Sequence, residues 1–378
     1  MKKIVFLTGT RADFGKLKSL ISISQNSSEF EVHIFVTGMH MNSLYGSTVD
    51  EVIKAGFKNI YKYINHNSGE TMDKTLAKTI AGFSQYISYI KPDLIVVHGD
   101  RLEALGGAIV GSFNNILVAH IEGGEVSGTI DELIRHSVTK MSHIHLVANS
   151  EAQKRLIQLG EFEKSIFILG SPDLDLMDEK SLPSLKKVKD YYDVLFDDFA
   201  IAMFHPITTE YENIRAYAKN FVDALIESDT NYILIYPNND LGSKEILEEI
   251  EKLKTSDRIK IFPSLRFEYF LRLLKESQFI IGNSSAGIRE APYYNVPTVD
   301  IGTRQNNRAK LNTIFNSSYE KEVIIGAIKK VKEIKKETED IQKNKFHFGK
   351  GRSDKLFLKL LNSEEFWNIQ HQKQFQEI

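Results

Sequence analysis

Acidic, basic and imidazole side chains are concentrated between residues 98 and 136. Two clusters, His98-Gly99-Asp100-Arg101 and His120-Ile121-Glu122-Gly123-Gly124, directly follow strand-like apolar runs, and Asp131 begins the helical pattern beyond the second cluster. The carboxyl ends of parallel strands are where ligands bind in open α/β sheets. Carboxylates gathered there can give and take protons when their surroundings separate their pKa values. We therefore expect Asp100, Glu122 and Asp131 to act on a substrate.

A simpler interpretation of part of this stretch is also open. Asp131 and Arg135 are four residues apart, so they would form an i, i+4 ion pair on the surface of a helix, where acids in the first turn also suit the helix dipole. The three acids come from two neighbouring loops that reach the same edge of one sheet, which favours catalysis.

A loop suited to phosphate follows an apolar run in the second half of the chain. Residues 279–281 lead into Gly282-Asn283-Ser284-Ser285-Ala286-Gly287 and then into a helical pattern that contains Glu290. Small residues allow a ligand to approach closely, and hydroxyls and N–H groups at a helix start bind phosphate. The alternative is a serine N-cap on a structural helix. We expect phosphate at the serines and a ribose diol at Glu290.

Basic and imidazole residues follow other expected strands. Arg11 and Lys16 come after a small-residue turn whose spacing fits neither G-x-G-x-x-G nor a Walker A loop. The two cations suit a diphosphate, and an ordinary turn with surface cations explains them equally well. His205 and Asn238 follow the first two expected strands of the second half. A histidine in such a place is as often structural as functional.

Short apolar runs alternate with helical patterns through both halves of the chain, which is typical of parallel βαβ units. The charged stretch 178–198 interrupts the alternation and is interpreted as a linker. The sequence therefore predicts an α/β protein of two doubly wound Rossmann-like domains facing across a cleft, as in glycosyltransferase-B-like enzymes. The expected domains are 1–175, with the acids, and 176–353, with the phosphate-binding loop. A C-terminal helix over 354–378 is expected to pack back on the first domain.

The individual elements follow from the same alternation. The expected strands are 4–7, 31–37, 94–97, 116–120, 144–148, 199–204, 232–236, 259–262, 279–281 and 298–301. The expected helices include 15–25, 48–55, 71–90, 211–227, 244–253, 267–276, one from Ser285, and a solvated lysine–glutamate-rich helix over 327–345.

Composition limits the classes of function. Lys plus Arg total 48 against 50 Asp plus Glu, so the formal net charge is −2 and does not favour nucleic acid or an anionic membrane. The absence of cysteine excludes disulfides, thiolate metal sites and cysteine nucleophiles. The N-terminal apolar run is about four residues, shorter than a signal peptide requires. No apolar run approaches the ~18–20 residues of a membrane span. We expect a cytoplasmic protein without nucleic-acid or membrane partners.

Taken together, the motifs resemble those of the hydrolysing UDP-N-acetylglucosamine 2-epimerases of bacterial sialic acid synthesis. The non-hydrolysing epimerases, which are similar more distantly, carry Arg-Pro-Glu in place of Arg11-Ala12-Asp13 and His-Val-Glu-Ala-Gly-Leu-Arg in place of residues 120–126. This chain takes the hydrolysing form at both places. The resemblance covers essentially the full length and is carried by residues 9–16, 98–101, 120–136, 204–206, 282–290 and 302–305.

The resemblance implies roles for single residues. UDP is expected on the second domain, with phosphate at the two serines, ribose at Glu290 and uracil at the backbone near Leu265. The expected catalytic residues are Asp100, Glu122, Asp131 and His205. The expected UDP- and substrate-binding residues are Arg11, Lys16, Arg101, His205, Asn238, Leu265, Gly282, Ser284, Ser285, Glu290 and Arg304.

The implied reaction converts UDP-N-acetylglucosamine (UDP-GlcNAc) to N-acetylmannosamine and UDP through 2-acetamidoglucal, without a metal or NAD cofactor. This is the first step towards sialic acid for capsule or surface polysaccharide. One alternative is the same reaction on UDP-2,4-diacetamido-2,4,6-trideoxyglucose, from the legionaminic acid pathway. A glycosyltransferase on the same fold is disfavoured by the three acids, and a non-catalytic UDP-sugar sensor would have lost them. The family implies a homodimer or homotetramer, with the 71–90 helix as a candidate interface.

Overall fold

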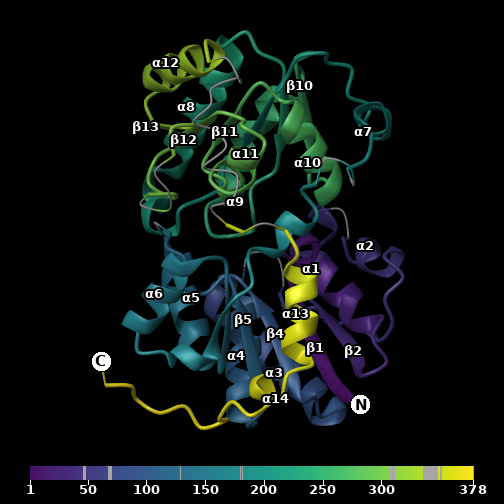
Figure 1. Cartoon of the computed structure of the whole chain (residues 1–378). Coiled ribbons are helices and arrows are strands. Elements are labelled where there is room, and N and C mark those ends of the chain that lie inside the picture. The colour runs from purple at the N-terminus through teal and green to yellow at the C-terminus, as the bar shows by residue number, and fades with distance from the viewer. Residues whose placement is uncertain are drawn as a thin grey trace. The chain divides into compact units, whose positions relative to one another are not determined.

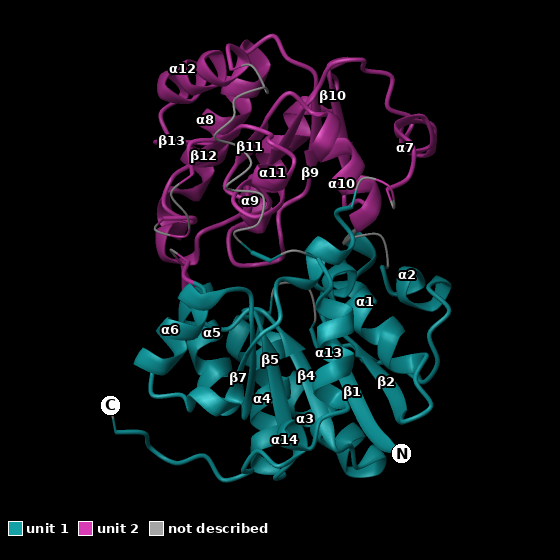
Figure 2. Ribbon diagram, viewed as in Figure 1, with its two compact units in different colours: residues 1–125, 131–178, 348–378 teal, residues 126–130, 179–347 magenta. Residues whose placement is uncertain are grey.

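The computed structural model forms two compact units (Figure 2). Unit 1 comprises residues 1–125, 131–178 and 348–378, and unit 2 comprises residues 126–130 and 179–347. The structure describes residues 1–45, 48–66, 70–127, 129–178, 180, 182–306, 308, 311–334, 348–349 and 351–377.

Unit 1 is built on a seven-stranded parallel sheet in the order β3-β2-β1-β4-β5-β6-β7, and Figure 1 labels β1, β2, β4 and β5 of this sheet. The strand order reverses between β1 and β4, and the loops that follow the strands at such a switch point are where doubly wound sheets bind ligands. The strands are β1 (Lys2–Thr8), β2 (Phe30–Val36), β3 (Ile60–Lys62), β4 (Leu94–His98), β5 (Leu117–Ile121), β6 (Ile144–Val147) and β7 (Ile166–Ile168). The helices are α1 (Arg11–Gln25), α2 (Val49–Lys54), α3 (Met72–Ile90), α4 (Leu102–Phe113), α5 (Ile130–Met141), α6 (Ser150–Gln158), α13 (Ser353–Leu361) and α14 (Glu364–Trp367).

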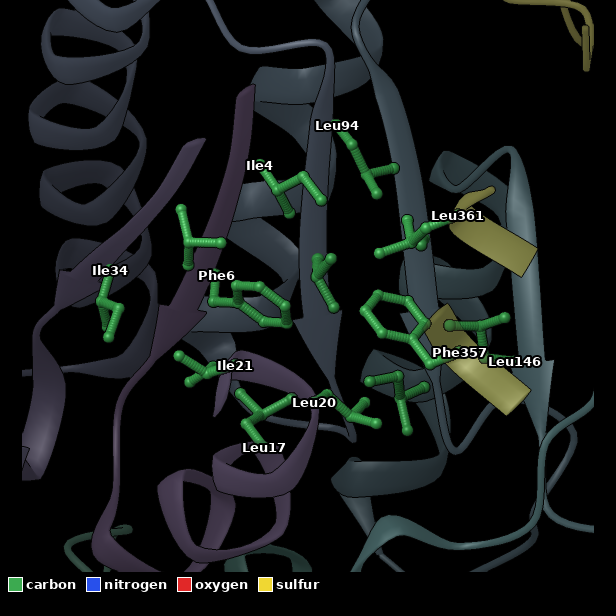
Figure 3. Close-up of a cluster of buried hydrophobic side chains, with 14 of the residues drawn as sticks. Ile4, Phe6, Leu17, Leu20, Ile21, Ile34, Leu94, Leu146, Phe357 and Leu361 are labelled. Carbon is green, nitrogen blue, oxygen red and sulfur yellow. The ribbon is translucent and has the colours of Figure 1, made fainter. Parts of the chain in front are cut away.

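The core of unit 1 joins segments from both ends of the chain. Phe6 of β1 and Leu17 of α1 pack in one buried cluster with Phe357 and Leu361 of α13 (Figure 3). The rings of Phe6 and Phe357 meet edge to face with centroids 6.2 Å apart. Full burial of a side chain of this size stabilises a fold by roughly 1.5–3 kcal/mol. Helix α13 is therefore part of the core of unit 1.

Unit 2 repeats the plan with a six-stranded parallel sheet in the order β10-β9-β8-β11-β12-β13. Its switch point lies between β8 and β11. The strands are β8 (Ala200–Met203), β9 (Tyr232–Ile235), β10 (Ile259–Phe262), β11 (Ile280–Gly282), β12 (Thr298–Ile301) and β13 (Ile314–Ser317). The helices are α7 (Leu185–Tyr192), α8 (Ile214–Glu227), α9 (Ser243–Ile250), α10 (Phe267–Glu276), α11 (Glu290–Tyr293) and α12 (Lys321–Lys332).

The predicted class of two doubly wound parallel sheets is confirmed, but several predicted elements are wrong. The helix expected from Ser285 is a three-residue 3₁₀ turn, Ser285–Gly287, followed by the four residues of α11. The single helix expected over 354–378 is two short helices that end at Leu361 and Trp367. Residues 178–198, expected to be a linker, contain α7. The helix expected over 327–345 is seen to Lys332 as part of α12, and residues 335–347 lie outside the described residues.

Three strands were not expected from the sequence: β3, β7 and β13. All three are at an edge of their sheet, where a strand has one neighbour. None of the helices formed by the described residues has the length and apolar character needed to cross a bilayer.

Candidate active site

Arg135 of α5 is the centre of an acidic group in unit 1. Its side chain is completely buried, Nη2 donates to Asp100 Oδ2, and Nη1 donates to the Glu125 carbonyl over 3.3 Å. Burial by itself lowers the pKa of this guanidinium, but the surrounding Asp100, Glu125, Glu122 and Asp131 raise it above its usual value. The alternative of a surface ion pair on α5 is therefore wrong. Asp100 is hydrogen-bonded to this buried cation, and the charges of the other two predicted acids, Glu122 and Asp131, also act on it.

Glu122 follows β5 in a backbone conformation that residues with a side chain avoid, with φ +68°. Its carboxylate is buried, accepts a hydrogen bond from Lys16 Nζ over 3.1 Å, and has His98 Nε2 3.2 Å away. Lys16 Nζ lies 3.7 Å from Asp173 as well. A left-handed residue of this kind costs about 1–3 kcal/mol and persists where its surroundings fix it. Helix α1 and strand β4 thus set the direction of the Glu122 carboxylate.

His120 joins the loop after β4 to helix α5. A carbonyl oxygen only accepts, so Nε2 carries the proton and donates to Gly99 O over 2.9 Å, and the Thr139 hydroxyl donates to Nδ1 over 3.1 Å. Complete burial lowers the pKa of His120 to about 3, so the ring is neutral at physiological pH. This neutral bridge ties the Asp100 loop to the helix that carries Asp131.

The predicted phosphate-binding arginines of unit 1 lie beside other carboxylates. Arg11 Nη2 is 3.8 Å from Glu51 Oε1, and Arg101 Nε is 3.9 Å from Glu103 Oε2. In the β1–α1 loop, directly before Arg11, the Asp13 carboxylate accepts the N–H groups of residues 9 and 10, both over 3.0 Å. These two hydrogen bonds hold the backbone directly before Arg11, at the switch point of the sheet.

In unit 2, His205 and Asn238 follow neighbouring strands and contact each other. The Asn238 N–H donates to His205 Nδ1 over 3.0 Å, so the proton of a neutral His205 ring is on Nε2. The Asn238 side chain turns back to Asp240, to which its Nδ2 donates. The structure thus brings two of the predicted UDP-binding residues together and fixes the tautomer of one.

The loop after β11 is held close to β8. Gly282 has φ +131°, and a Cβ there would lie 1.8 Å from the Met203 carbonyl oxygen, so only glycine fits. Ser284 Oγ accepts the Ala286 N–H over 3.3 Å, as the N-cap alternative required, although the capped element is the 3₁₀ turn. Ser285 follows at the same edge of the sheet. Glu290 begins α11 and is buried.

Arg304 and Leu265 complete the predicted set at this edge of the unit 2 sheet. Arg304 Nη1 donates to the Asn283 carbonyl over 3.3 Å, while Leu265 follows β10 and is buried. The neighbouring Thr303 hydroxyl donates to Glu210 Oε1 over 2.5 Å, and the Tyr319 hydroxyl donates to the other oxygen of that carboxylate over 2.9 Å. Glu210 therefore anchors the loop that carries Arg304.

Comparison with known proteins identifies the family. The model of the UDP-N-acetylglucosamine 2-epimerase family matches residues 23–362. The chain belongs to this family. It is 49% identical over 376 residues to the UDP-N-acetylglucosamine 2-epimerase of Neisseria meningitidis serogroup B, with 99% of each chain covered. It is also 34% identical over 321 residues to the UDP-N,N'-diacetylbacillosamine 2-epimerase (hydrolyzing) of Legionella pneumophila, with 84% of this chain and 85% of that protein covered.

The fold agrees with this membership. The crystal structure of the Methanocaldococcus jannaschii UDP-GlcNAc 2-epimerase in complex with UDP-GlcNAc and UDP superposes with a TM-score of 0.80 at 24% identity, covering 96% of this chain and 99% of that one. The glycosyltransferase-B-like fold class predicted from the sequence is confirmed.

Four residues of this epimerase that the sequence did not assign contact the predicted site. Arg135 and His98 lie beside the acids, Asp173 lies beside Lys16, and Asn283 accepts from Arg304. His98 and Asn283 lie within the motifs 98–101 and 282–290, and this position in the sequence could have indicated that they contact the site. Asp173 lies in the 3₁₀ helix Pro172–Asp175, outside every motif, and only the structure places it.

Proposed function

We propose that the protein is a hydrolysing 2-epimerase that converts UDP-GlcNAc and water to N-acetylmannosamine and UDP. The observation that carries the proposal is the buried Arg135, which is hydrogen-bonded to Asp100 and feels the charges of Glu122 and Asp131. The 49% identity to the Neisseria protein named UDP-N-acetylglucosamine 2-epimerase supports the choice of substrate. The N-acetylmannosamine formed is a precursor for sialic acid.

The chemistry explains why several carboxylates are needed. The proton on carbon 2 of the sugar is not adjacent to a carbonyl and is not acidic, so the bond from carbon 1 to the UDP oxygen breaks first. Positive charge then develops at carbon 1, and a carboxylate takes the carbon 2 proton to give 2-acetamidoglucal and UDP. Water next adds its hydroxyl to carbon 1. Carbon 2 then receives a proton on the face opposite to the one from which the first proton was removed. One group must therefore accept a proton and another must donate one.

We assign this proton transfer to the three acids of unit 1 and the binding of UDP to the loops of unit 2. Cations and N–H donors that meet the departing diphosphate stabilise the charge that develops on it. His205, protonated on Nε2, and Arg304 provide such donors, and the loop 282–285 provides small residues and hydroxyls. His205 is thus both a ligand and a candidate proton donor to the leaving group.

A second substrate is a specific alternative. The Legionella relative, at 34% identity, is named for UDP-N,N'-diacetylbacillosamine and for the hydrolysing reaction. The same three acids would serve there, since the chemistry at carbons 1 and 2 is unchanged. The substrates differ at carbons 4 and 6 of the sugar, so direct assay is the way to separate them.

We also propose a homodimer or homotetramer that uses the surface of α3 and α4. Tyr89 of α3 is 85% exposed and Phe113 of α4 is 74% exposed, and these helices pack on each other. Aromatic side chains of this size are enriched at protein interfaces. Tyr89→Lys with Phe113→Lys is expected to shift the protein to monomer in size-exclusion chromatography with light scattering. An unchanged mass would place the interface elsewhere.

Incubation with UDP-GlcNAc in heavy water, followed by proton NMR of the sugar, tests the reaction. We expect UDP and free N-acetylmannosamine with deuterium at carbon 2, because the proton returned there comes from solvent. Unlabelled N-acetylglucosamine would instead mean simple hydrolysis, and the proposal would be wrong. A parallel reaction with the diacetamido sugar nucleotide compares the two substrates through kcat/KM. Binding of UDP without turnover of either sugar would favour a sensor.

A further inference from the structure

Asn283 lies at the switch point of the unit 2 sheet, directly after β11 and opposite the end of β8. Its side chain is completely buried, and its backbone N–H donates to the Met203 carbonyl over 3.1 Å. The ladder between the two strands ends with the pair Gly282 and Met203. Neighbouring loops diverge beyond this point in doubly wound sheets, which opens the crevice where ligands bind. Asn283 occupies that position without exposing a side-chain atom.

The amide of Asn283 holds both backbone groups of His205. The His205 N–H donates to Asn283 Oδ1 over 2.6 Å, and Asn283 Nδ2 donates to the His205 carbonyl over 2.8 Å. A side-chain amide thus takes the place of a peptide group and extends the β8–β11 pairing by one residue. The two bonds fix the backbone of His205, whose ring in turn accepts from the Asn238 N–H.

The backbone carbonyl of Asn283 holds a second loop. It accepts from Arg304 Nη1 over 3.3 Å and from Gln305 Nε2 over 2.8 Å. Gln305 is buried, so its amide is a fixed support for the loop after β12. One residue therefore connects the ends of β8, β11 and β12, and reaches β9 through the His205 ring.

We propose that Asn283 is a positioning residue that sets His205 and Arg304 in register for the UDP diphosphate. The inference rests on the proposed function and deepens it. Asn283 acts through other residues, because its side chain is completely buried and its amide is bonded to the backbone of His205. A displacement of binding residues by about 1 Å from the productive geometry can lower the reaction rate roughly 100-fold. The donor and acceptor pattern of an amide is what the position requires.

Asn283→Asp and Asn283→Ser test the proposal in the full-length protein. Aspartate keeps the acceptor for the His205 N–H but places an oxygen against the His205 carbonyl, and serine is neutral, smaller and spans neither bond. We expect the Kd for UDP, measured by calorimetry, to rise about tenfold or more in both variants, equivalent to the loss of about one hydrogen bond. KM for the sugar nucleotide should rise with it.

The matched control is Asn231→Asp at the opposite edge of the same sheet. Asn231 Nδ2 donates to the Asp198 carbonyl over 3.0 Å, so the substitution also replaces an amide donor to a backbone carbonyl. We expect unchanged Kd and KM there. A merely structural role for Asn283 would lower the number of UDP sites per chain and kcat while leaving Kd and KM unchanged, and that result would overturn the proposal.

The two proposals fail in different ways. UDP binding is measured without turnover, so a parent protein that binds UDP but does not epimerise would remove the proposed function and leave the test of Asn283 intact. Unchanged UDP affinity in a folded Asn283→Ser protein would remove the positioning role while the epimerase reaction stands.

Discussion

At the scale of single residues, two of the predicted acids of unit 1, Asp100 and Glu122, are each held by a cation from a distant part of the chain. Arg135 binds Asp100 from 35 positions away, and Lys16 binds Glu122 from 106 positions away. A buried carboxylate that loses its partner is left as an uncompensated charge, which is strongly unfavourable. Asp100 and Glu122 therefore depend on these two cations for direction as well as for stability.

Replacement of the acids by their amides tests their chemical role. Asp100→Asn, Glu122→Gln and Asp131→Asn preserve size and remove the group that exchanges protons. General acid–base catalysis contributes typically 10²–10⁴-fold, so we expect kcat to fall by about that factor in each variant. UDP affinity should be nearly unchanged, because these residues belong to unit 1. Full activity in all three variants would remove them from the mechanism.

Lys16 gives a sharper test because two roles are in competition. The sequence predicted a ligand for the diphosphate, whereas the structure places Nζ on Glu122 and near Asp173. We expect Lys16→Met to lower kcat about 100-fold by releasing the Glu122 carboxylate, with the Kd for UDP within about twofold of the parent. A raised Kd with unchanged kcat would restore the diphosphate role. Lys54→Met, at an exposed position of α2, is the control.

The position of the acids beyond the strand ends could be predicted from the sequence, and their partners could not. Asp100 and Glu122 each stand just beyond a continuous apolar run, a local signal that survives without any knowledge of packing. The contacts of Lys16 with Glu122 and of Asn283 with His205 join residues that only the folded sheets bring together. The left-handed backbone of Glu122 has no sequence signal either, since glutamate seldom adopts it.

At the scale of elements, the C-terminal segment supports the helix that carries Asp131 and Arg135. Lys373 Nζ donates to the carbonyls of Thr139 and Ser142 at the end of α5, over 3.1 and 2.7 Å, and to Glu161 Oε2 over 2.5 Å. The last carbonyls of a helix have no partner within the helix, and a lysine ammonium can satisfy them. The tail therefore caps α5 from outside the helix.

Lys373→Met measures this support. The variant removes the cap and one of the cations at the buried Glu161, so we expect unit 1 to lose about 2–3 kcal/mol of unfolding free energy. The single tryptophan, Trp367 in α14, reports the unfolding of unit 1 by its fluorescence in urea. Lys355→Met, at an exposed position of α13, should leave the midpoint unchanged. Equal midpoints for the two variants would show that the tail adds no stability.

Most strands that the sequence predicted are central in their sheets, and the edge strand β10 was predicted as well, with the bounds 259–262. Strands β1, β4, β5, β8, β9 and β11 are covered on both sides by neighbours and read as continuous apolar runs. The edge strands β3, β7 and β13 have one neighbour and include exposed or half-buried positions, so their apolar signal is broken. Helix α7 was missed because its charged face dominates a stretch in which Val188 is the buried residue.

At the scale of the whole molecule, three buried histidines of unit 1 and one buried carboxyl of unit 2 respond to acid in opposite ways. Burial lowers the pKa of His40 to about 4, of His120 to about 3 and of His143 to about 4, and all three belong to unit 1. In unit 2, burial raises the pKa of Asp300 on β12 to about 7, although Arg304 opposes the rise. The two shifts act on stability with opposite sign.

As the pH falls, the three histidines of unit 1 bind protons in the unfolded chain at a higher pH than they do in the folded protein. These histidines titrate near pH 6.5 when unfolded and near pH 3–4 when folded, so the stabilisation is complete above pH 6.5 and is lost as the pH falls. The loss is about 2 kcal/mol for each of these histidines between pH 7 and pH 5. For Asp300 the folded state holds the proton up to about pH 7, whereas the unfolded state releases it near pH 3.8. Unit 2 therefore gains about 2 kcal/mol from this group over the same fall in pH.

Urea unfolding of the full chain at pH 7 and pH 5 separates the two responses. Trp367 fluorescence reports unit 1, and far-ultraviolet circular dichroism reports both units. We expect acid to move the fluorescence midpoint to lower urea and to move the remaining dichroism transition to higher urea. Asp300→Asn should cancel the second movement, because an amide binds no proton, and should leave the first unchanged. A common shift of both probes to lower urea, unaffected by Asp300→Asn, would contradict the opposite pH responses of the two sheets.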